Sequence, residues 1–352
     1  MKLYKQVYIA IDLHSNHSLI GFMNQQGQYI GQQQVSTTAV NLINAVTAIP
    51  AECKWLTLEQ SNIAFWAAEQ LRDYVDKLIV CDPRHNALIS ASENKNDHLD
   101  TLRLCRLLRL GSLKPVWTPE HLGIRRLFYS QMKEYQRLVK TMSIHKRQLT
   151  ASLRNWGVNT TVSARDYRNP AGIIGQLPSE LLREELQAKF SFIQAVSGQV
   201  HQQFERIRQT GEQFWEIAEF QKMSGIGPVG AHTFSAYIQT PHRFRRRGQL
   251  IQFCQLGVRK FTSDGKRVGN ERLSKAGHGC LKNLAHVAWK ASLGSDNEVC
   301  RFYQNSLQNT GNPTHARLNT QRKILITLWS IWKNNRSYNP EKFFSGSGDS
   351  AR

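Results

Sequence analysis

The chain has 352 residues, and its 46 Lys and Arg against 26 Asp and Glu give it a formal net charge of +20. That length supports two or three domains with their own cores, and Lys, Arg, Asn or Gln interrupts every apolar run before it could cross a bilayer. The charge favours a polyanionic partner such as nucleic acid over a small acidic substrate, although a basic protein without such a partner is the alternative.

The six cysteines are scattered along the chain and form no C-x-x-C pair. This spacing argues against a zinc knuckle and a disulfide framework, and it fits a reducing compartment. Residues 1–6 lead directly into a strand-like run, so we expect no secretory signal and a cytoplasmic protein. The cysteines are Cys53, Cys81, Cys105, Cys254, Cys280 and Cys300.

Residues 1–115 alternate between strand-like and helix-like patterns. Three adjacent strands, followed by helix, strand, helix, strand and helix, are the element order of a ribonuclease-H-like (Holliday-junction-resolvase-like) α/β core. The sequence therefore predicts such a domain here. The expected strands are residues 7–11, 19–23, 29–35, 55–58 and 78–81, and the expected helices are near 38–49 and 65–75.

Residues 116–220 show the seven-residue spacing of long helices with coiled-coil seams. A loop over 157–178, broken by Gly and Pro, separates two such helices. We expect a helical hairpin or a dimerising pair, and plain core packing also explains the apolar stripe. The stripe consists of Phe128, Tyr135, Met142, Leu149 and Trp156 on the first helix, and of Leu186, Phe190, Ile193, Val200, Phe204, Ile207 and Phe214 on the second.

Residues 221–335 are expected to form a third, mainly helical domain, so the fold class is α/β plus α. The segment 224–230 opens this domain with a Gly-rich pattern similar to a helix-hairpin-helix turn. The amides of such a turn can bind phosphate, and tight helix packing is the alternative. Residues 336–352, with Ser and Gly alternating over 345–348, are expected to be a disordered tail.

Four acidic residues stand out against this basic background. Asp12 follows the first predicted strand and Glu59 follows the fourth, and these strands are neighbours in a ribonuclease-H-like sheet. Asp97 and Asp100 begin a predicted helix and, three residues apart, share one of its faces. Four carboxylates gathered in this way predict a site for Mg²⁺ or Mn²⁺, whereas taken alone the helical pair could simply stabilise a helix N-terminus.

These acidic residues resemble the tetrad of the DEDD transposases of bacterial insertion sequences, the family of the bridge-RNA-guided recombinases and Piv-type DNA invertases. The matching segments are 10–12, 58–59 and 94–100. In the second half, 224–230, 253–257, 263–266 and 273–278 are similar, in order, to the family's C-terminal transposase signature. The resemblance covers most of residues 5–335, and it implies a C-terminal transposase domain.

The resemblance also implies a mechanism, in which a serine placed near the carboxylate-bound metals breaks DNA. The matching position is Ser263, and Ser274 is the rival that the sequence alone leaves open. A serine hydroxyl needs a base or a metal to become a good nucleophile, and a phosphoserine linkage would retain the bond energy needed for rejoining. Target and donor DNA, a noncoding bridge RNA and a dimer or dimer of dimers are the implied partners.

Basic side chains are expected to contact the phosphate backbone, although a solvated helix face would look similar. One set follows the helix over 125–154, a second lies in the dense run 243–247, and Lys275 could join a wall near Ser263. The candidate nucleic-acid-binding residues are Arg125, Arg126, Lys133, Arg137, Lys140, Lys146, Arg147, Arg154, Arg243, Arg245, Arg246, Arg247 and Lys275.

The sequence thus predicts a metal-dependent DNA transposase or recombinase with a serine nucleophile. A Piv-like site-specific invertase is one alternative outcome of the same chemistry. A second alternative is a junction-resolving nuclease of the same fold, which would use water and need no serine. The third is a non-catalytic nucleic-acid-binding protein that retains the fold.

Overall fold

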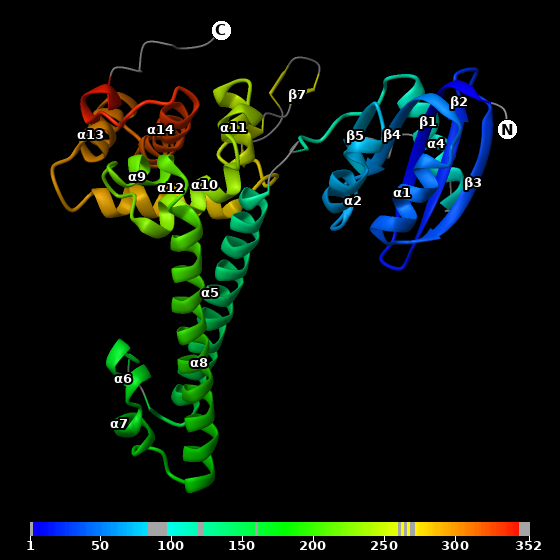
Figure 1. Ribbon diagram of the computed structural model, residues 1–352. Helices are drawn as coiled ribbons and strands as arrows, with labels where there is room; N and C mark the ends of the chain where they lie inside the picture. The colour runs from blue at the N-terminus through cyan, green and yellow to red at the C-terminus, as the bar shows by residue number, and fades with distance from the viewer. Residues whose placement is uncertain are drawn as a thin grey trace. The chain divides into compact units, whose positions relative to one another are not determined.

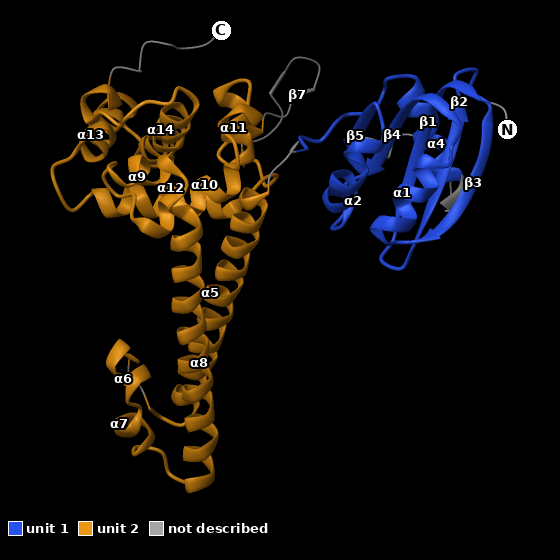
Figure 2. Cartoon of the chain, in the orientation of Figure 1, with its two compact units in different colours: residues 1–121 blue, residues 122–352 orange. Residues whose placement is uncertain are grey.

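The computed structural model describes residues 3–83, 97–118, 123–158, 161–259, 262–263, 266–267 and 272–344. For residues 97, 98, 262, 263, 266 and 267 this description covers the backbone alone. The chain forms two compact units, residues 1–121 (unit 1) and 122–352 (unit 2) (Figure 2). Within the described ranges, no helix is both long and apolar enough to span a membrane.

Unit 1 is built on a five-stranded mixed sheet with the order β3-β2-β1-β4-β5. β1 pairs antiparallel with β2, and β2 with β3, whereas β1 and β4, and β4 and β5, are parallel. All five predicted strands are confirmed. They are β1 (Tyr4–Leu13), β2 (His17–Asn24), β3 (Tyr29–Ser36), β4 (Ala51–Glu59) and β5 (Lys77–Cys81).

Helices cover both faces of this sheet (Figure 1). Alternate residues of a strand point to opposite faces, so Ile9 and Ile11 pack with α1 (Ala39–Thr47) and α2 (Ala64–Leu71). Tyr8 and Ala10 pack instead with Leu104, Cys105 and Leu108 of α4 (Asp97–Arg109). A short 3₁₀ turn, η1 (Arg72–Tyr74), follows α2. The structure is therefore a mixed α/β layered unit, as the element order predicted.

Unit 2 begins with a long antiparallel hairpin, in which α5 (Ile124–Asn155) packs along α8 (Glu180–Gly211) (Figure 1). This confirms the predicted hairpin. The segment between them was expected to be a loop, but it contains α6 (Ala164–Arg168) and α7 (Ala171–Ile174). The loop prediction is wrong there because Ser163 and Asp166 form a capping box that nucleates α6 within a Gly- and Pro-containing segment.

The predicted seven-residue seam only partly matches the buried face of the hairpin. Phe128 and Leu149 of α5, and Leu186 and Phe190 of α8, are fully buried. Trp156 is 54% exposed, although the heptad pattern placed it in the seam. It is the residue that ends α5, so the helical periodicity no longer directs its side chain toward the partner helix.

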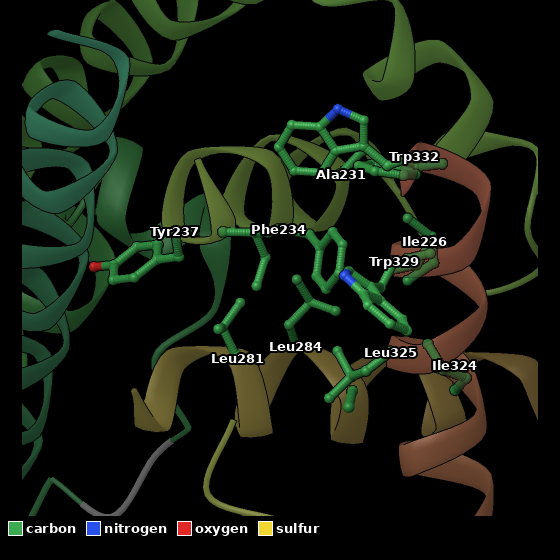
Figure 3. Packing of buried hydrophobic residues seen from close by; sticks show 14 of the residues in the cluster. Ile226, Ala231, Phe234, Tyr237, Leu281, Leu284, Ile324, Leu325, Trp329 and Trp332 are labelled. Carbon is green, nitrogen blue, oxygen red and sulfur yellow. The ribbon is translucent and has the colours of Figure 1, made fainter. Parts of the chain in front are cut away.

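The rest of unit 2 is helical. The helices of this part pack around Phe234, which lies near Leu284 and Trp329 (Figure 3). The indole nitrogen of Trp329 donates to the Pro241 carbonyl at 2.8 Å, which satisfies its polar group inside the core. The elements are α9 (Trp215–Gln221), α10 (Pro228–Ile238), η2 (Pro241–Arg243), α11 (Arg247–Phe253), α12 (Gly279–Ser292), α13 (Glu298–Thr310), α14 (Pro313–Lys333) and η3 (Pro340–Phe343).

One hydrophobic core joins the base of the hairpin to these C-terminal helices. Phe128 and Met132 of α5 and Ile207 of α8 belong to the same buried cluster as Phe234. The boundary expected near residue 220 therefore does not coincide with a break in the core. Division of 116–335 into two separately folding domains stays a prediction.

The segment expected to begin a disordered tail is in fact packed onto unit 2. The Tyr338 amide donates to Glu219 Oε2 at 2.9 Å, and its hydroxyl donates to Glu298 Oε1 at 2.7 Å. Phe343 is fully buried, with its ring 5.6 Å from that of Phe302. The prediction of disorder is wrong for residues 336–344, because the Phe343 ring is buried in the core of unit 2. Residues 345–352 lie outside the described residues.

Candidate catalytic and nucleic-acid-binding sites

Asp12 and Glu59 lie at the ends of neighbouring parallel strands. The register pairs Ala10 with Thr57 and Ile11 with Leu58, and the two acidic residues come next on each strand. The carboxyl ends of parallel strands meet at one edge of a sheet. The structure therefore brings Asp12 and Glu59 to the same edge, as the sequence predicted.

Both residues also belong to the sheet face that α4 covers. Asp12 is two residues beyond Ala10, whose side chain packs toward α4, and residues i and i+2 of a strand share a face. Glu59 pairs with Cys81 of β5, and Cys81 packs in the same α4-side cluster. The opposite face is filled by Ile11 and Leu58, which pack against α1 and α2.

The first turn of α4 lies toward this same edge. Thr101 packs against Gly21, where a Cβ atom would come within 2.9 Å of its side chain, and Gly21 pairs with Ala10. At the other end of α4, the Arg109 side chain packs against Gly27 in the β2–β3 turn. This turn follows Asn24, which pairs with Val7 near the start of β1. α4 thus runs antiparallel to β1, which places its first turn, with Asp97 and Asp100, toward the end of β1 that carries Asp12.

The described carboxylates of this edge have basic neighbours. Asp12 Oδ2 lies 3.1 Å from His14 Nε2, and Asp100 Oδ1 lies 3.4 Å from Arg103 Nη1. Among the side chains that the structure describes, no three His, Cys, Asp or Glu groups lie close enough to hold a metal ion. The Asp97 side chain is outside that set, so the predicted tetrad extends beyond the described residues. A donor set made only of carboxylate oxygens fits Mg²⁺ or Mn²⁺ rather than zinc.

Ser263 lies in a β-hairpin that we call the arm, residues 258–273. At its base β6 (Val258–Arg259) pairs with β9 (Arg272–Leu273), and further out β7 (Thr262–Ser263) pairs with β8 (Lys266–Arg267). The backbone of Ser263 pairs with that of Lys266, so this serine is in a short strand. Its side chain lies outside the described residues.

Two sequence motifs meet at the base of the arm and close it. The Gln255 side chain donates to the carbonyl oxygens of Lys275 and Gly277, at 2.8 and 2.9 Å. The His278 amide donates to the Phe253 carbonyl at 2.8 Å. Gly277 has a φ of +112°, and a Cβ there would lie 2.3 Å from that same carbonyl oxygen, so only glycine fits. The motifs 253–257 and 273–278 therefore form one structural unit.

Ser274, the rival nucleophile, has a structural role in this closure. Its amide donates to the Gly257 carbonyl at 2.7 Å, and its hydroxyl oxygen accepts from the Ala276 amide at 3.2 Å. The residue is only 5% exposed. A buried serine that caps a turn is poorly placed to attack a DNA phosphate.

An aromatic and basic cluster surrounds His278 beside the arm. The imidazole lies 4.6 Å from the Phe253 ring and 5.2 Å from the Tyr237 ring, measured between centroids. Burial lowers the pKa of His278, and the charges of Arg243 and Lys133 lower it further, so the imidazole is neutral at pH 7. The Tyr237 hydroxyl hydrogen-bonds to Gln136 of α5 at 2.7 Å. The base of the arm is thereby fixed against α5.

Residues 218–304, which contain the arm and the His278 cluster, match the family model described as "Transposase IS116/IS110/IS902 family". Over 312 residues the chain is also 22% identical to "Putative transposase y4qE" of Sinorhizobium fredii, a similarity that covers 81% of this chain and 72% of that protein. These two similarities support a transposase of the IS116/IS110/IS902 type for this chain. The resemblance inferred from the ordered motifs is confirmed.

Two of the transposase's candidate phosphate-binding residues are partly buried and have partners inside unit 2. Arg125 donates to Glu216 Oε1 at 2.6 Å and to the Ser235 hydroxyl at 3.0 Å, and its guanidinium lies 3.8 Å from the centroid of the Phe214 ring. Arg243 donates to the Tyr237 carbonyl at 3.3 Å, and burial lowers its pKa to about 10. For these two, aromatic rings and internal acceptors already hold part of the guanidinium group, and their role as phosphate contacts stays a prediction.

The other candidates lie at the surface of the transposase or partly so. Arg126 and Lys146 are partly exposed, and the others are exposed. The exposed cations therefore follow one long helix and the turn before α11. Those others are Lys133, Arg137, Lys140, Arg147, Arg154, Arg245, Arg246, Arg247 and Lys275.

The first residue of the 224–230 element packs against neighbouring helices. The Ser224 amide and hydroxyl both donate to the Glu298 carboxylate, each at 2.9 Å, and the Ser292 hydroxyl donates to the Ser224 carbonyl at 3.1 Å. A carboxylate on that amide occupies the place that a phosphate would need. Of the two alternatives left by the sequence, tight packing describes this end of the element.

Sequence reasoning missed several residues that position these sites. Gln255, Tyr237 and Gln136 fix the arm, and Glu216 fixes Arg125. Gln255 lies within the 253–257 motif but was not singled out there, and the other three lie in no motif; each acts through a partner distant in the sequence. The strongest signal in the sequence was Glu216, which has apolar residues directly on both sides, since a carboxylate buried among them needs a partner.

Proposed function

We propose that this transposase cleaves and rejoins DNA with a divalent-metal site in unit 1 and a serine nucleophile in unit 2. The observation that carries the metal site is the register of β1 and β4, which sets Asp12 beside Glu59 on the sheet face covered by α4. A mixed sheet of this order with helices on both faces supports a ribonuclease-H-like fold for unit 1.

Asp12, Glu59, Asp97 and Asp100 would hold Mg²⁺ or Mn²⁺ at this edge. When bound, such ions polarise a phosphodiester and stabilise the charge that develops on its oxygens. Arg103 partly balances the negative charge of this edge through its contact with Asp100. The chain's own contribution is to hold four hard oxygen donors on two strand ends and one helix turn.

Ser263 is the proposed nucleophile. Its hydroxyl oxygen forms a bond to phosphorus while the bond from phosphorus to the leaving strand's oxygen breaks. The serine proton passes to a base or to water, and the leaving alkoxide takes up a proton. Reversal of these steps with a different strand end rejoins the DNA without an external energy source. The structural role of Ser274 supports this choice between the two serines.

The proposed partners follow from the basic surface and from the family. The exposed cations of α5 and of residues 245–247 suit phosphate backbones of target and donor DNA, and a noncoding bridge RNA is the proposed guide. The length of the α5–α8 hairpin, 32 residues in each helix, suits coiled-coil contacts between copies in a dimer or dimer of dimers.

The decisive experiment looks for a covalent protein–DNA adduct. Wild-type protein, Ser263→Ala and Ser274→Ala are incubated with labelled DNA, co-purified RNA and Mn²⁺, and the products are separated on denaturing gels. We expect an adduct in the wild type and in Ser274→Ala, and none in Ser263→Ala. Ser263→Ala should still bind DNA, because phosphate contacts do not use its hydroxyl.

Two other outcomes would redirect the proposal. An adduct that survives in Ser263→Ala and is lost in Ser274→Ala would reassign the nucleophile. DNA cleavage without any adduct in all three proteins would favour the water-using nuclease.

A further inference from the structure

Two adjoining hollows flank one tyrosine on the α5–α8 hairpin. The first has a volume of about 370 Å³ and the second about 410 Å³, both within the size range of small-ligand pockets. Lys146 and Tyr167 line both hollows, so the two are halves of one site, which we call the Tyr167 site. The first adds Arg147, Thr150, Ala151 and Arg154, and the second adds Ala164, Arg168, Ile193, Gln194, Ser197 and His201.

The tyrosine is held by α6 and by both long helices. The Ser163 hydroxyl and amide donate to the Asp166 carboxylate, at 2.6 and 2.7 Å, which fixes the start of α6. Gln194 of α8 donates to the carbonyl oxygens of Tyr167 and Arg168, at 2.8 and 3.3 Å. The Tyr167 ring packs 6.0 Å from that of Phe190, between centroids. Hydrogen bonds at both ends of α6 therefore hold the Tyr167 ring in one position.

The charge of the Tyr167 site is positive and uncompensated. The Lys146 ammonium lies 4.4 Å from the centre of the Tyr167 ring, and Arg147, Arg154 and Arg168 are exposed around it. The nearest acid, Asp166, already accepts the two bonds from Ser163, and these hydrogen bonds lower its pKa. Across the described part of the hairpin, none of these four cations is in an ion pair with a carboxylate.

We propose that the Tyr167 site binds an unpaired strand of nucleic acid, with nucleotides entering the hollows and phosphates meeting the four cations. The inference rests on the nucleic-acid binding proposed above for α5 and assigns part of that surface to single strands. A duplex backbone needs only a row of surface cations. Hollows beside an aromatic ring suit a strand whose bases are splayed out and can pack on side chains.

Binding and crosslinking of short homopolymers test this proposal in the full-length protein. The probes are labelled oligo(U) and oligo(dT) of about ten nucleotides and a blunt DNA duplex of equal length. Tyr167→Leu should weaken single-strand binding roughly 5- to 150-fold, the range seen for loss of one stacked base. Lys146→Gln should reduce the salt slope of that binding by about 0.7. Oligo(U) carrying 4-thiouracil should crosslink to the peptide containing Tyr167.

Matched variants keep these results interpretable. Tyr167→Phe keeps the ring and should bind as the wild type does, while Arg168→Gln tests the site without touching the hairpin core. Arg206→Gln removes an equally exposed cation of α8 outside both hollows and should change single-strand affinity less than twofold. Preference for oligo(U) over oligo(dT) would identify RNA as the strand, and equal binding or the reverse preference would identify DNA.

The proposal is overturned if Tyr167→Leu and Lys146→Gln bind both single strands within twofold of the wild type. It is also overturned if Arg206→Gln weakens binding as much as Lys146→Gln, or if the crosslink maps elsewhere. These readouts need no cleavage. If no covalent adduct forms, the single-strand binding result can still support the Tyr167 site. If single-strand binding is unaffected by the substitutions, the adduct result can still support Ser263.

Discussion

At the scale of single residues, arginines that are adjacent in the sequence have different surroundings in the structure. Arg125 begins a helix rich in cations, yet its guanidinium is enclosed by Phe214, Trp332 and the fully buried carboxylate of Glu216. Arg126, the next residue, is also partly exposed but does not share these contacts with Phe214 and Trp332. A one-residue step turns a helical side chain by about 100°, so neighbours in a basic run can have unrelated surroundings.

Removing the cation of this buried pair should destabilise unit 2. Arg125→Gln leaves the Glu216 carboxylate without its charged partner in the interior, and we expect a loss of roughly 3 kcal/mol in the free energy of unfolding. Urea unfolding followed by circular dichroism measures it. Lys140→Gln, an exposed cation on the same helix, is the control and should change the free energy by less than about 0.5 kcal/mol. Equal effects of the two substitutions would mean that the pair is not structural.

The acidic edge of unit 1 gives a second prediction at this scale. Asp12→Asn or Asp100→Asn should abolish DNA cleavage while leaving unfolding unchanged, since each substitution removes a metal-binding charge from an already crowded acidic edge. Cleavage assays with Mn²⁺ and thermal melts measure the two effects. Asp73→Asn, an exposed acid of the same unit, should cleave as the wild type does. Full activity in both site variants would exclude this edge as the metal site.

At the scale of elements, short segments are fixed by contacts that cross long sequence distances. The arm is closed because Gln255 and the Phe253 carbonyl bind a turn about twenty residues later. The chain's last described segment is fixed in the same manner, since Tyr338 bonds to Glu219 and Glu298, which come from two different helices. Such contacts order segments whose own sequence suggests little structure.

The C-terminal segment supplies the prediction at this scale. Phe343→Ala should lower the free energy of unfolding by about 3–5 kcal/mol, the usual cost of removing a fully buried aromatic ring. Phe192→Ala on α8 removes a ring that is 45% exposed and serves as the matched control, with a much smaller effect. Chemical unfolding of the full chain measures both. Equal stability of Phe343→Ala and the wild type would restore the view that the whole tail is disordered.

At the scale of the whole molecule, the charge of +20 is carried by a protein in two compact units. Unit 1 carries the acidic edge, and unit 2 carries the arm, the helical hairpin and all of the candidate phosphate contacts. This distribution suits a transposase in which the cations of unit 2 bind DNA phosphates and the acidic edge of unit 1 takes part in the reaction.

The salt dependence of DNA affinity tests whether the exposed cations of unit 2 bind phosphates. Duplex DNA binding should weaken steeply between low and physiological salt, since each phosphate contact contributes about 0.9 to the slope of log K against log salt. Combined substitution of Arg245, Arg246 and Arg247 by Gln should reduce the slope by about 0.9 for each phosphate that these arginines neutralise in the wild type. Fluorescence anisotropy across a salt series measures it. A flat response of the wild type would show that these exposed cations do not meet phosphates.

The sequence by itself determined the layered α/β order of unit 1, the two long helices and the transposase family. These rest on local periodicity and on motif order, which are properties of contiguous residues. The pairing of Asp12 with Glu59 was also predictable, because strand order follows from element order.

Only the tertiary structure decided which cations are buried, how the arm closes and where residues 336–344 pack. It also brought Lys146 and Tyr167, which are separated by the end of α5, into one site. Burial and pairing of this kind depend on surfaces contributed by distant segments. A residue's own neighbours in the sequence do not specify which of those surfaces will meet it.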